Sequence, residues 1–158
     1  MRGFLLVLGG LDPLRSALGR SRLGIDLLTA LAPQPVAGHW AVCVDLDTAS
    51  TPCRMTAAPF TGMCLSGRVY GVAAPTSQGR DPATTIRNAV AAGGRDAQGR
   101  INGEYCFCLL DAGTGLLHAS VDLFGVRGLY YLEHQGLWAV SDSCSALLAL
   151  FGSALDLN

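Results

Sequence analysis

Only a few side chains in this sequence have a type and spacing that would support catalysis or metal binding. Cys106 and Cys108 lie two residues apart and share one strand face. We expect both to be small buried apolar residues, and the alternative is zinc binding or redox chemistry. Ser141-Asp142-Ser143 precedes a helical pattern, a position typical of a helix cap and not of a nucleophile. The histidines have no metal-ligand spacing; they are His39, His118 and His134.

The composition indicates one globular domain over residues 1–158. The chain has 158 residues, 50% of them hydrophobic and only 15% charged, which excludes a disordered protein. No apolar run approaches the ~18 residues of a membrane span. A net charge of −1 gives no electrostatic case for nucleic acid binding. The six cysteines are scattered without a CxxC pair, so we expect reduced thiols in a cytoplasmic protein.

Short strands and helices must position these side chains. Predicted strands are residues 3–8, 41–46, 64–70, 104–110, 116–121, 129–133 and 137–141. Predicted helices run from Asp12-Pro13 to about residue 18, over 25–31, from Asp81-Pro82 to about residue 92, and from a cap at Ser141 or Asp142 to residue 150. Short links join the last four strands, so we expect one antiparallel meander. Strand 104–110 is apolar on both faces, which indicates a sheet between other layers in an α+β domain.

Three segments of the second half occur in an order that points to a known family. They read I-N-G-E-Y-C-F-C-L-L-D at 101–111, D-L-F-G-V-R-G-L-Y-Y at 122–131 and A-V-S-D-S-C-S-A-L-L at 139–148. Together they resemble the N-terminal glutaminase domain of the asparagine-synthetase family, and looser similarities extend upstream at 30–35, 39–45 and 65–71. The resemblance implies a class II glutamine amidotransferase-like domain with the N-terminal-nucleophile fold, a four-layer αββα sandwich of antiparallel sheets. We expect no synthetase domain in residues 1–158.

The catalytic position of the family pattern is changed. Active members use a cysteine exposed by removal of the initiator methionine, whose thiolate attacks the side-chain amide of glutamine with its own α-amine as base. The resemblance assigns Arg2 to this position, and Gly3 after it matches. A guanidinium cannot attack a carbonyl. We therefore expect no catalytic residue here.

The substrate-binding positions differ as well. The family's Asn-Gly pair, which supplies the oxyanion hole, corresponds to Ser66 and Gly67. The adjoining Glu, which holds the amine of glutamine, corresponds to Arg68, a reversal of charge, and the closing Asn corresponds to Gly71. One of the arginines that would grip the carboxylate corresponds to Trp40. The core and turn motifs survive, which is the pattern of a scaffold retained after its chemistry was lost.

The resemblance implies a structural or interaction role in an amide-bond-forming enzyme. Degenerate glutaminase domains of this kind occur in β-lactam synthetases and lasso-peptide macrocyclases. The resemblance therefore implies a role in natural-product biosynthesis or in asparagine biosynthesis. The expected partner is an ATP-dependent synthetase domain or subunit, together with a peptide or amino-acid substrate. ATP and Mg would be required only in that partner, because no S-G-G-x-D pyrophosphate loop occurs here. We expect no metal or cofactor for this chain, and neither nucleic acid nor membrane as a partner.

Two alternatives stay open. In the first, the chain is an active glutamine amidotransferase that supplies ammonia for asparagine-type amide synthesis, which requires a mature N-terminus that carries a cysteine. In the second, the chain is a small-molecule or peptide binding module. Arg68 beside Trp40 would then form a vestigial pocket that binds a carboxylate or stacks on a ring. The opposing interpretation is that Trp40 is a core residue and Arg68 is solvated.

Overall fold

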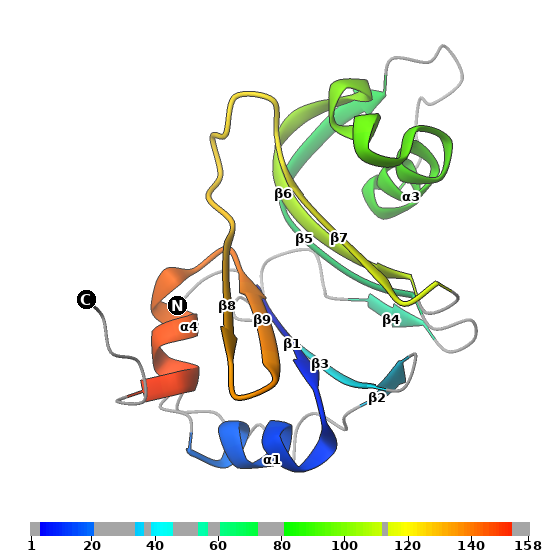
Figure 1. Cartoon of the computed structure of the whole chain (residues 1–158). Helices are drawn as coiled ribbons and strands as arrows, with labels where there is room; N and C mark the ends of the chain where they lie inside the picture. Colours follow the sequence, from blue (N-terminus) through cyan, green and yellow to red (C-terminus); the bar gives the residue numbers. More distant parts are fainter. Residues whose placement is uncertain are drawn as a thin grey trace.

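Two antiparallel sheets face each other, and helices cover their outer faces (Figure 1). The computed structural model describes residues 4–20, 34–36, 39–45, 54–56, 61–72, 81–111 and 114–152. Helices α1 (Leu11–Arg20) and α4 (Cys144–Phe151) cover the first sheet. Helix α3 (Pro82–Gly93), continued by the 3-10 helix η1 (Gly94–Arg100), covers the second sheet. This layered arrangement confirms the predicted αββα sandwich.

The first sheet joins strands from both ends of the chain. Its order is β2–β3–β1–β9–β8, so β1 is hydrogen-bonded to β3 on one side and to β9 on the other. The bounds are β1 (Phe4–Gly9), β2 (Gln34–Val36), β3 (His39–Asp45), β8 (Tyr130–His134) and β9 (Leu137–Ser141). The second sheet has the order β4–β5–β6–β7, with β4 (Arg54–Thr56), β5 (Thr61–Val72), β6 (Ile101–Asp111) and β7 (Leu116–Val121).

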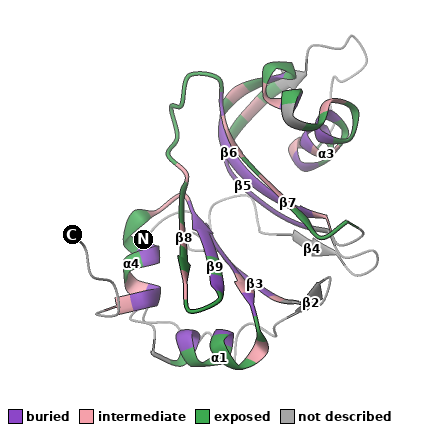
Figure 2. Ribbon diagram, in the orientation of Figure 1, coloured by how far each residue is buried: buried purple, intermediate pink, exposed green. Residues whose placement is uncertain are grey.

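From Tyr105 to Leu110, strand β6 is buried on both faces, as its sequence predicts (Figure 2). Tyr105 and Phe107 face α3 and stack with ring centroids 5.9 Å apart. Cys106 and Cys108 face the other sheet, where they join a cluster of apolar side chains between the sheets. The alternation follows from the two-residue period of a strand. Each sheet therefore has one face in the central layer and one face under its helices.

The predicted meander of four strands is wrong. Strands β6 and β7 pair with each other, and β8 and β9 pair with each other, but the two pairs belong to different sheets. The segment that follows β7, residues 122–129, carries the chain from the second sheet to the first (Figure 1). A short link is compatible both with a hairpin and with a crossing between packed sheets. The contacts of Asp122, described below, direct the chain across.

The helix caps agree with the sequence at α3 and differ at α4. Asp81 is the N-cap of α3 and its carboxylate accepts a hydrogen bond from the Thr84 N–H at 3.3 Å, as the Asp-Pro signature predicts. The N-cap of α4 is Ser143, not Ser141 or Asp142, because the side chains of those two residues bind β1 instead.

Two further helix predictions differ from or fall outside the structure. The first helix begins at Leu11, one residue before the expected cap at Asp12, because the Leu14 N–H already donates to the carbonyl of Gly10 at 3.0 Å. The helix predicted over residues 25–31 lies outside the described residues.

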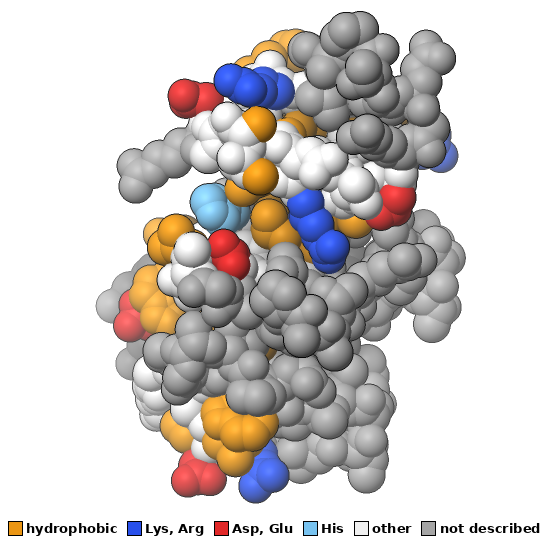
Figure 3. Space-filling model, turned by 90° about the vertical axis from the view of Figure 1, so that its right-hand side faces the viewer, with side chains coloured by type: hydrophobic (Ala, Val, Ile, Leu, Met, Phe, Trp, Pro, Cys, Tyr) orange, Lys and Arg blue, Asp and Glu red, His pale blue; other side chains and the backbone are white. Residues whose placement is uncertain are grey.

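The surface of the described residues carries charges of both signs. On the face shown in Figure 3, arginine and acidic side chains are scattered among hydrophobic ones and form no patch of a single sign. Among the helices that the structure describes, none has the length and the apolar content required to cross a membrane.

The Tyr105 hydroxyl gives a test of the packing beneath α3. This side chain is fully buried, its hydroxyl has no hydrogen-bond partner among the described residues, and burial, followed by the charge of Asp122, raises its pKa. Removing a buried polar group without a partner costs no hydrogen bond. We expect Tyr105→Phe to leave the free energy of unfolding unchanged or to raise it by up to about 1 kcal/mol, measured by urea unfolding.

The matched control is Phe107→Ala on the same strand face, which leaves a cavity. It should lower the free energy of unfolding by about 3–5 kcal/mol. A loss of more than about 1 kcal/mol in Tyr105→Phe would contradict the prediction, because it would mean that the hydroxyl has a partner.

Candidate functional site between the sheets

Ser66 and Gly67, the positions assigned to the oxyanion hole, lie on β5 opposite Cys106 and Tyr105 of β6. Ser66 is buried, and its hydroxyl oxygen accepts a hydrogen bond from Nη1 of Arg127 at 3.2 Å. The residue pair is therefore joined to the segment that crosses between the sheets, 61 positions later in the sequence.

Gly67 sits where no other residue fits. Its φ is +106°, a backbone conformation that L side chains rarely adopt. A Cβ atom at this position would lie 2.0 Å from the carbonyl oxygen of Glu104 and 2.7 Å from Nε of Arg127. The sequence therefore retains this glycine for a steric reason: the β6 backbone and the Arg127 side chain close over it.

Asp122 holds the crossing segment that carries Arg127. Its side chain is 1% exposed, and its carboxylate accepts hydrogen bonds from the N–H groups of Phe124 (3.0 Å), Val126 (3.2 Å) and Arg127 (3.3 Å). Burial by itself raises the pKa of Asp122, but these N–H groups outweigh it and hold the pKa below its ordinary value of 3.8. Gln98 adds bonds from its side-chain amide to the carbonyls of Val121 and Asp122.

The start of β1 is bound by the segment between β9 and α4. The Phe4 N–H donates to Oδ1 of Asp142 at 2.7 Å, and the Ser141 hydroxyl donates to the Phe4 carbonyl at 2.5 Å. The Ser141 oxygen also accepts from the Ser143 N–H at 3.0 Å. The segment expected to cap a helix thus fixes the first described residue of the chain beside the central layer.

Cys106 is the thiol that these elements surround. Burial raises its pKa to about 12, with a further rise from Asp142 and a partial offset from Arg127. Burial also raises the pKa of the Cys108 thiol. Because the thiolate is the nucleophilic form, the Cys106 thiol is protonated and unreactive at neutral pH.

The remaining predicted site residues lie in different surroundings. Trp40 packs against the core beneath α1 and α4, on the face of the first sheet that points away from the second sheet. Arg68 is exposed on β5, and Gly71 pairs with Asn102 next to an irregularity in the β5–β6 ladder. Arg2 lies outside the described residues. A shared pocket of Trp40 and Arg68 stays a prediction.

The described cysteines agree with one prediction from the sequence and differ from another. In the described part of the chain, no three His, Cys, Asp or Glu side chains gather as a metal ion would require. Cys106 and Cys108 share one face, as expected. Cys43 is disulfide-bonded, so the expectation that the thiols are all reduced is wrong at that residue.

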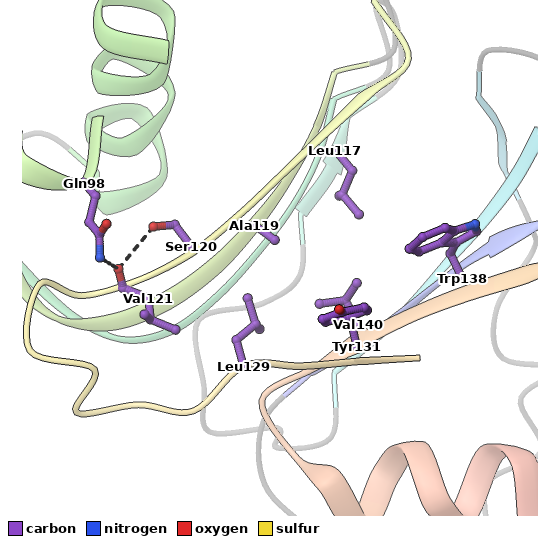
Figure 4. A pocket seen from close by; sticks show the side chains of 9 residues that line it. All are labelled: Gln98, Leu117, Ala119, Ser120, Val121, Leu129, Tyr131, Trp138 and Val140. Atoms are coloured by element: carbon purple, nitrogen blue, oxygen red, sulfur yellow. Dashed lines mark hydrogen bonds between the residues drawn. The ribbon is translucent and has the colours of Figure 1, made fainter. Parts of the chain in front are cut away.

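A cavity of about 470 Å³ opens between the two sheets on the side of β7 and β8 (Figure 4). Side chains of β7 line one wall, and Tyr131, Trp138 and Val140 line the other. Gln98 and Ser120 both donate hydrogen bonds to the Val121 carbonyl at one end. The cavity reaches the neighbourhood of the Cys106 cluster, because Val121 pairs with Cys106 across β6 and β7.

Sequence reasoning missed Arg127, Asp142 and Cys106 as parts of one cluster. The signal for Arg127 was its place after Phe-Gly-Val in the crossing segment, and the signal for Asp142 was its place directly after β9. Neither position reveals its partner, because Ser66 and Phe4 are 61 and 138 residues away in the sequence.

Asp122 gives a pH-dependent prediction. Its pKa is lowered in the folded state, so its contribution to stability is present above the unfolded-state value of about 3.9 and is lost as the pH falls through the lower folded value. We expect Asp122→Asn to lower the urea midpoint at pH 7, and to differ progressively less from the wild type below about pH 4.

Equilibrium urea unfolding at pH 7 and at pH 3 measures both effects. The matched control is Glu133→Gln, which changes an exposed carboxylate on β8 and should leave the midpoint unchanged at pH 7. An Asp122→Asn midpoint equal to that of the wild type at pH 7 would refute the role assigned to this carboxylate.

The comparisons with known proteins match the second half of this architecture. A family model of the glutamine amidotransferase domain matches residues 73–149, a range that includes α3, the strands β6 to β9 and the crossing segment. No curated protein matches the chain. The match supports a glutamine amidotransferase-type domain. It does not reach Arg2, Ser66 or Gly67, the residues to which the resemblance assigns the catalytic positions.

Proposed function

We propose that the chain is a catalytically degenerate glutamine amidotransferase-type domain that partners an ATP-dependent synthetase domain in amide-bond formation. The observation that carries the proposal is the state of the thiol at the candidate site. Cys106 is buried beside Ser66 and Arg127, with a pKa raised to about 12. In an active domain of this class the nucleophile is the thiolate of an N-terminal cysteine, a position that the resemblance assigns to Arg2, and a protonated thiol elsewhere in the site does not attack an amide in its place.

The assignment of the other catalytic positions supports the same conclusion. Arg2 would replace the nucleophile, and its guanidinium has neither a nucleophilic atom nor a basic one at neutral pH. Ser66 would replace the amide donor of the oxyanion hole. The Ser66 side chain is shorter than an asparagine, and its oxygen accepts from Arg127.

Retention of the scaffold argues for a role other than hydrolysis. The Asp122 bonds, the Arg127–Ser66 bond and the anchoring of Phe4 by Asp142 fix the same strands and segments that an active domain would need. A domain free of any function would not be expected to keep a buried carboxylate with three backbone partners, since burying it without them is costly.

The crossing segment has the features of a contact surface. Leu123, Phe124 and Val126 are 68%, 86% and 61% exposed, although Asp122 holds the backbone between them rigidly. Tyr131 and Trp138, beside the cavity, are also exposed, at 74% and 46%. Neighbouring exposed apolar side chains on a fixed backbone are typical of a protein–protein interface.

In this proposal the chemistry is divided between two domains. The synthetase domain binds ATP and Mg and activates a carboxylate, and an amine of its own substrate attacks the activated carbonyl. The present chain supplies packing surface and no ammonia. Precedents by resemblance include the β-lactam synthetases and lasso-peptide macrocyclases, so asparagine-type or natural-product amide synthesis is the proposed context.

Glutamine hydrolysis tests the catalytic half of the proposal. We expect the purified chain to release no ammonia from L-glutamine above the buffer rate, measured with a glutamate dehydrogenase-coupled assay. Intact mass after incubation with an electrophilic glutamine analogue should show no adduct.

Ammonia release that persists through purification, or a single covalent adduct, would overturn degeneracy and favour the active amidotransferase. The mature N-terminal residue, read from the same mass spectrum, would then identify the nucleophile. Cys106→Ala is the matched control, because it removes the buried thiol and should change neither result.

Substitution of Phe124 tests the proposed contact between the crossing segment and a synthetase domain. The partner to use is the synthetase encoded in the same reading frame or in the adjacent one, and binding is measured by titration calorimetry. We expect Phe124→Ser to weaken association by about 10-fold or more, since exposed aromatic side chains dominate such interfaces.

Leu148→Ser on α4 is the control for this experiment. Leu148 is also exposed, at 39%, but lies on the helix layer outside the first sheet. Equal affinity of Phe124→Ser and the wild type would contradict a contact through the crossing segment.

A further inference from the structure

The outer edge of the second sheet is formed by β7. In the described part of the chain, β7 (Leu116–Val121) pairs with β6 on one side and has no strand on the other. Ala119, in the middle of β7, is exposed. A strand edge of this kind can pair with an extended segment of another chain.

The register of β6 and β7 determines which backbone groups point to this edge. The Asp122 N–H donates to the Tyr105 carbonyl at 2.8 Å, so these two opposite residues form a hydrogen-bonded pair. Hydrogen-bonded and non-hydrogen-bonded pairs alternate along an antiparallel ladder. The N–H and C=O groups of Leu117, Ala119 and Val121 therefore point away from β6.

Gln98 already binds one of these outward groups. Its side-chain amide donates to the Val121 carbonyl at 2.8 Å, and this bond ends the open part of the edge. Among the described residues, no comparable bond reaches the outward groups of Leu117 and Ala119. These two residues therefore offer two N–H donors and two carbonyl acceptors to an added strand.

A cavity lies on each face of this edge. The first is the cavity of about 470 Å³ between the sheets, which the side chains of Leu117, Ala119 and Val121 line (Figure 4). The second, of about 310 Å³, lies between β7 and the helix layer, and His118 and Ser120 line it. Successive side chains of a strand point to opposite faces. A strand paired with β7 would therefore place alternate side chains in the two cavities.

The walls of the cavities indicate which side chains such a strand would carry. Tyr131 and Trp138 make the cavity between the sheets apolar, so it suits aliphatic side chains. His118 and Ser120 supply polar groups to the second cavity, so small polar side chains suit it.

The charge beside the first cavity also selects a partner. Glu133 pairs with Trp138 across β8 and β9, so both side chains lie on the face of the first sheet that lines this cavity. Both are exposed. An arginine or lysine side chain would meet the Glu133 carboxylate and the face of the Trp138 ring together.

We propose that β7 binds an extended peptide segment by strand addition. The segment carries aliphatic side chains at alternate positions, which fill the cavity between the sheets, and a basic side chain at one end, which binds Glu133. Main-chain hydrogen bonds supply affinity, and the two cavities supply selectivity. The site lies across β6 from Ser66 and Gly67, and the inference does not rest on the proposed function.

Amide hydrogen exchange of the full chain, followed residue by residue by NMR, tests the proposal. In the free protein we expect the N–H groups of Leu117 and Ala119 to exchange rapidly, and those of His118 and Ser120, which bond β6, to be protected. The probe is the synthetic peptide acetyl-R-S-L-S-L-S-R-amide, which presents the same side chains in either strand direction. At millimolar concentration it should slow exchange at Leu117 and Ala119 by about 10-fold or more.

Three controls accompany this measurement, with affinities from titration calorimetry. The peptide R-L-L-S-S-S-R has the same composition but cannot place both leucines on one face, so it should bind about 10-fold more weakly. Ala119→Pro removes one outward N–H and leaves the ladder with β6 intact, and it should weaken binding by about 10-fold. Phe124→Ser, the variant directed at the crossing segment, should bind the peptide as the wild type does. Failure of this proposal and failure of the proposed function are therefore distinguishable.

Four results would overturn the proposal. Protection of Leu117 and Ala119 in the free protein would mean that the edge is already paired. If that protection rises with protein concentration and a dimer sediments, the edge binds a second copy of the chain instead. Unchanged exchange at both amides with the peptide present would exclude strand addition. Equal affinity of folded Ala119→Pro and the wild type would do the same, and if this variant fails to fold, the exchange of the wild type decides.

Discussion

The buried carboxylate of Asp122 is the interaction on which the arrangement of the two sheets depends. A charged group that is 1% exposed is tolerated only when hydrogen bonds replace water, and three backbone N–H groups between residues 124 and 127 do so here. Those bonds turn the chain at the end of β7 and direct it to β8 in the other sheet. They also place Arg127 over Gly67. One side chain thus determines both the topology and the shape of the candidate site.

The local elements could be predicted from the sequence because their causes are local. Alternation of apolar residues defined β7 and β9 with their observed bounds, and an Asp-Pro pair defined the start of α3. The pairing of strands could not be predicted in the same way. Hairpin geometry and sheet crossing use similar turn residues, so the short links of the second half gave a meander where the structure has two separate pairs. The side-chain contacts of Asp122, which decide between them, have no periodic signature.

The residues of the candidate site could be predicted from the sequence, but the contacts between them could not. Resemblance singled out Ser66 and Gly67, and both lie in the contact that closes around Arg127. The same resemblance paired Trp40 with Arg68, whereas the alternation of β3 turns Trp40 toward the helix layer. A single residue's face in a strand can be inferred only when the register is known. The charged and hydrogen-bonding neighbours of a buried thiol can be identified only from the tertiary structure.

The central position of β1 has a consequence for the synthesis of the chain. This apolar strand lies between β3 and β9, and its first amide is bound by Asp142, 138 residues later. At a ribosomal rate of roughly 5–20 residues per second, its final partner emerges about 7–28 s after it does. Until then, one edge of an apolar strand stays unpaired outside the ribosome. The first sheet therefore closes only after β9 and Asp142 have left the ribosome, and until then the open edge of β1 can pair with other strands.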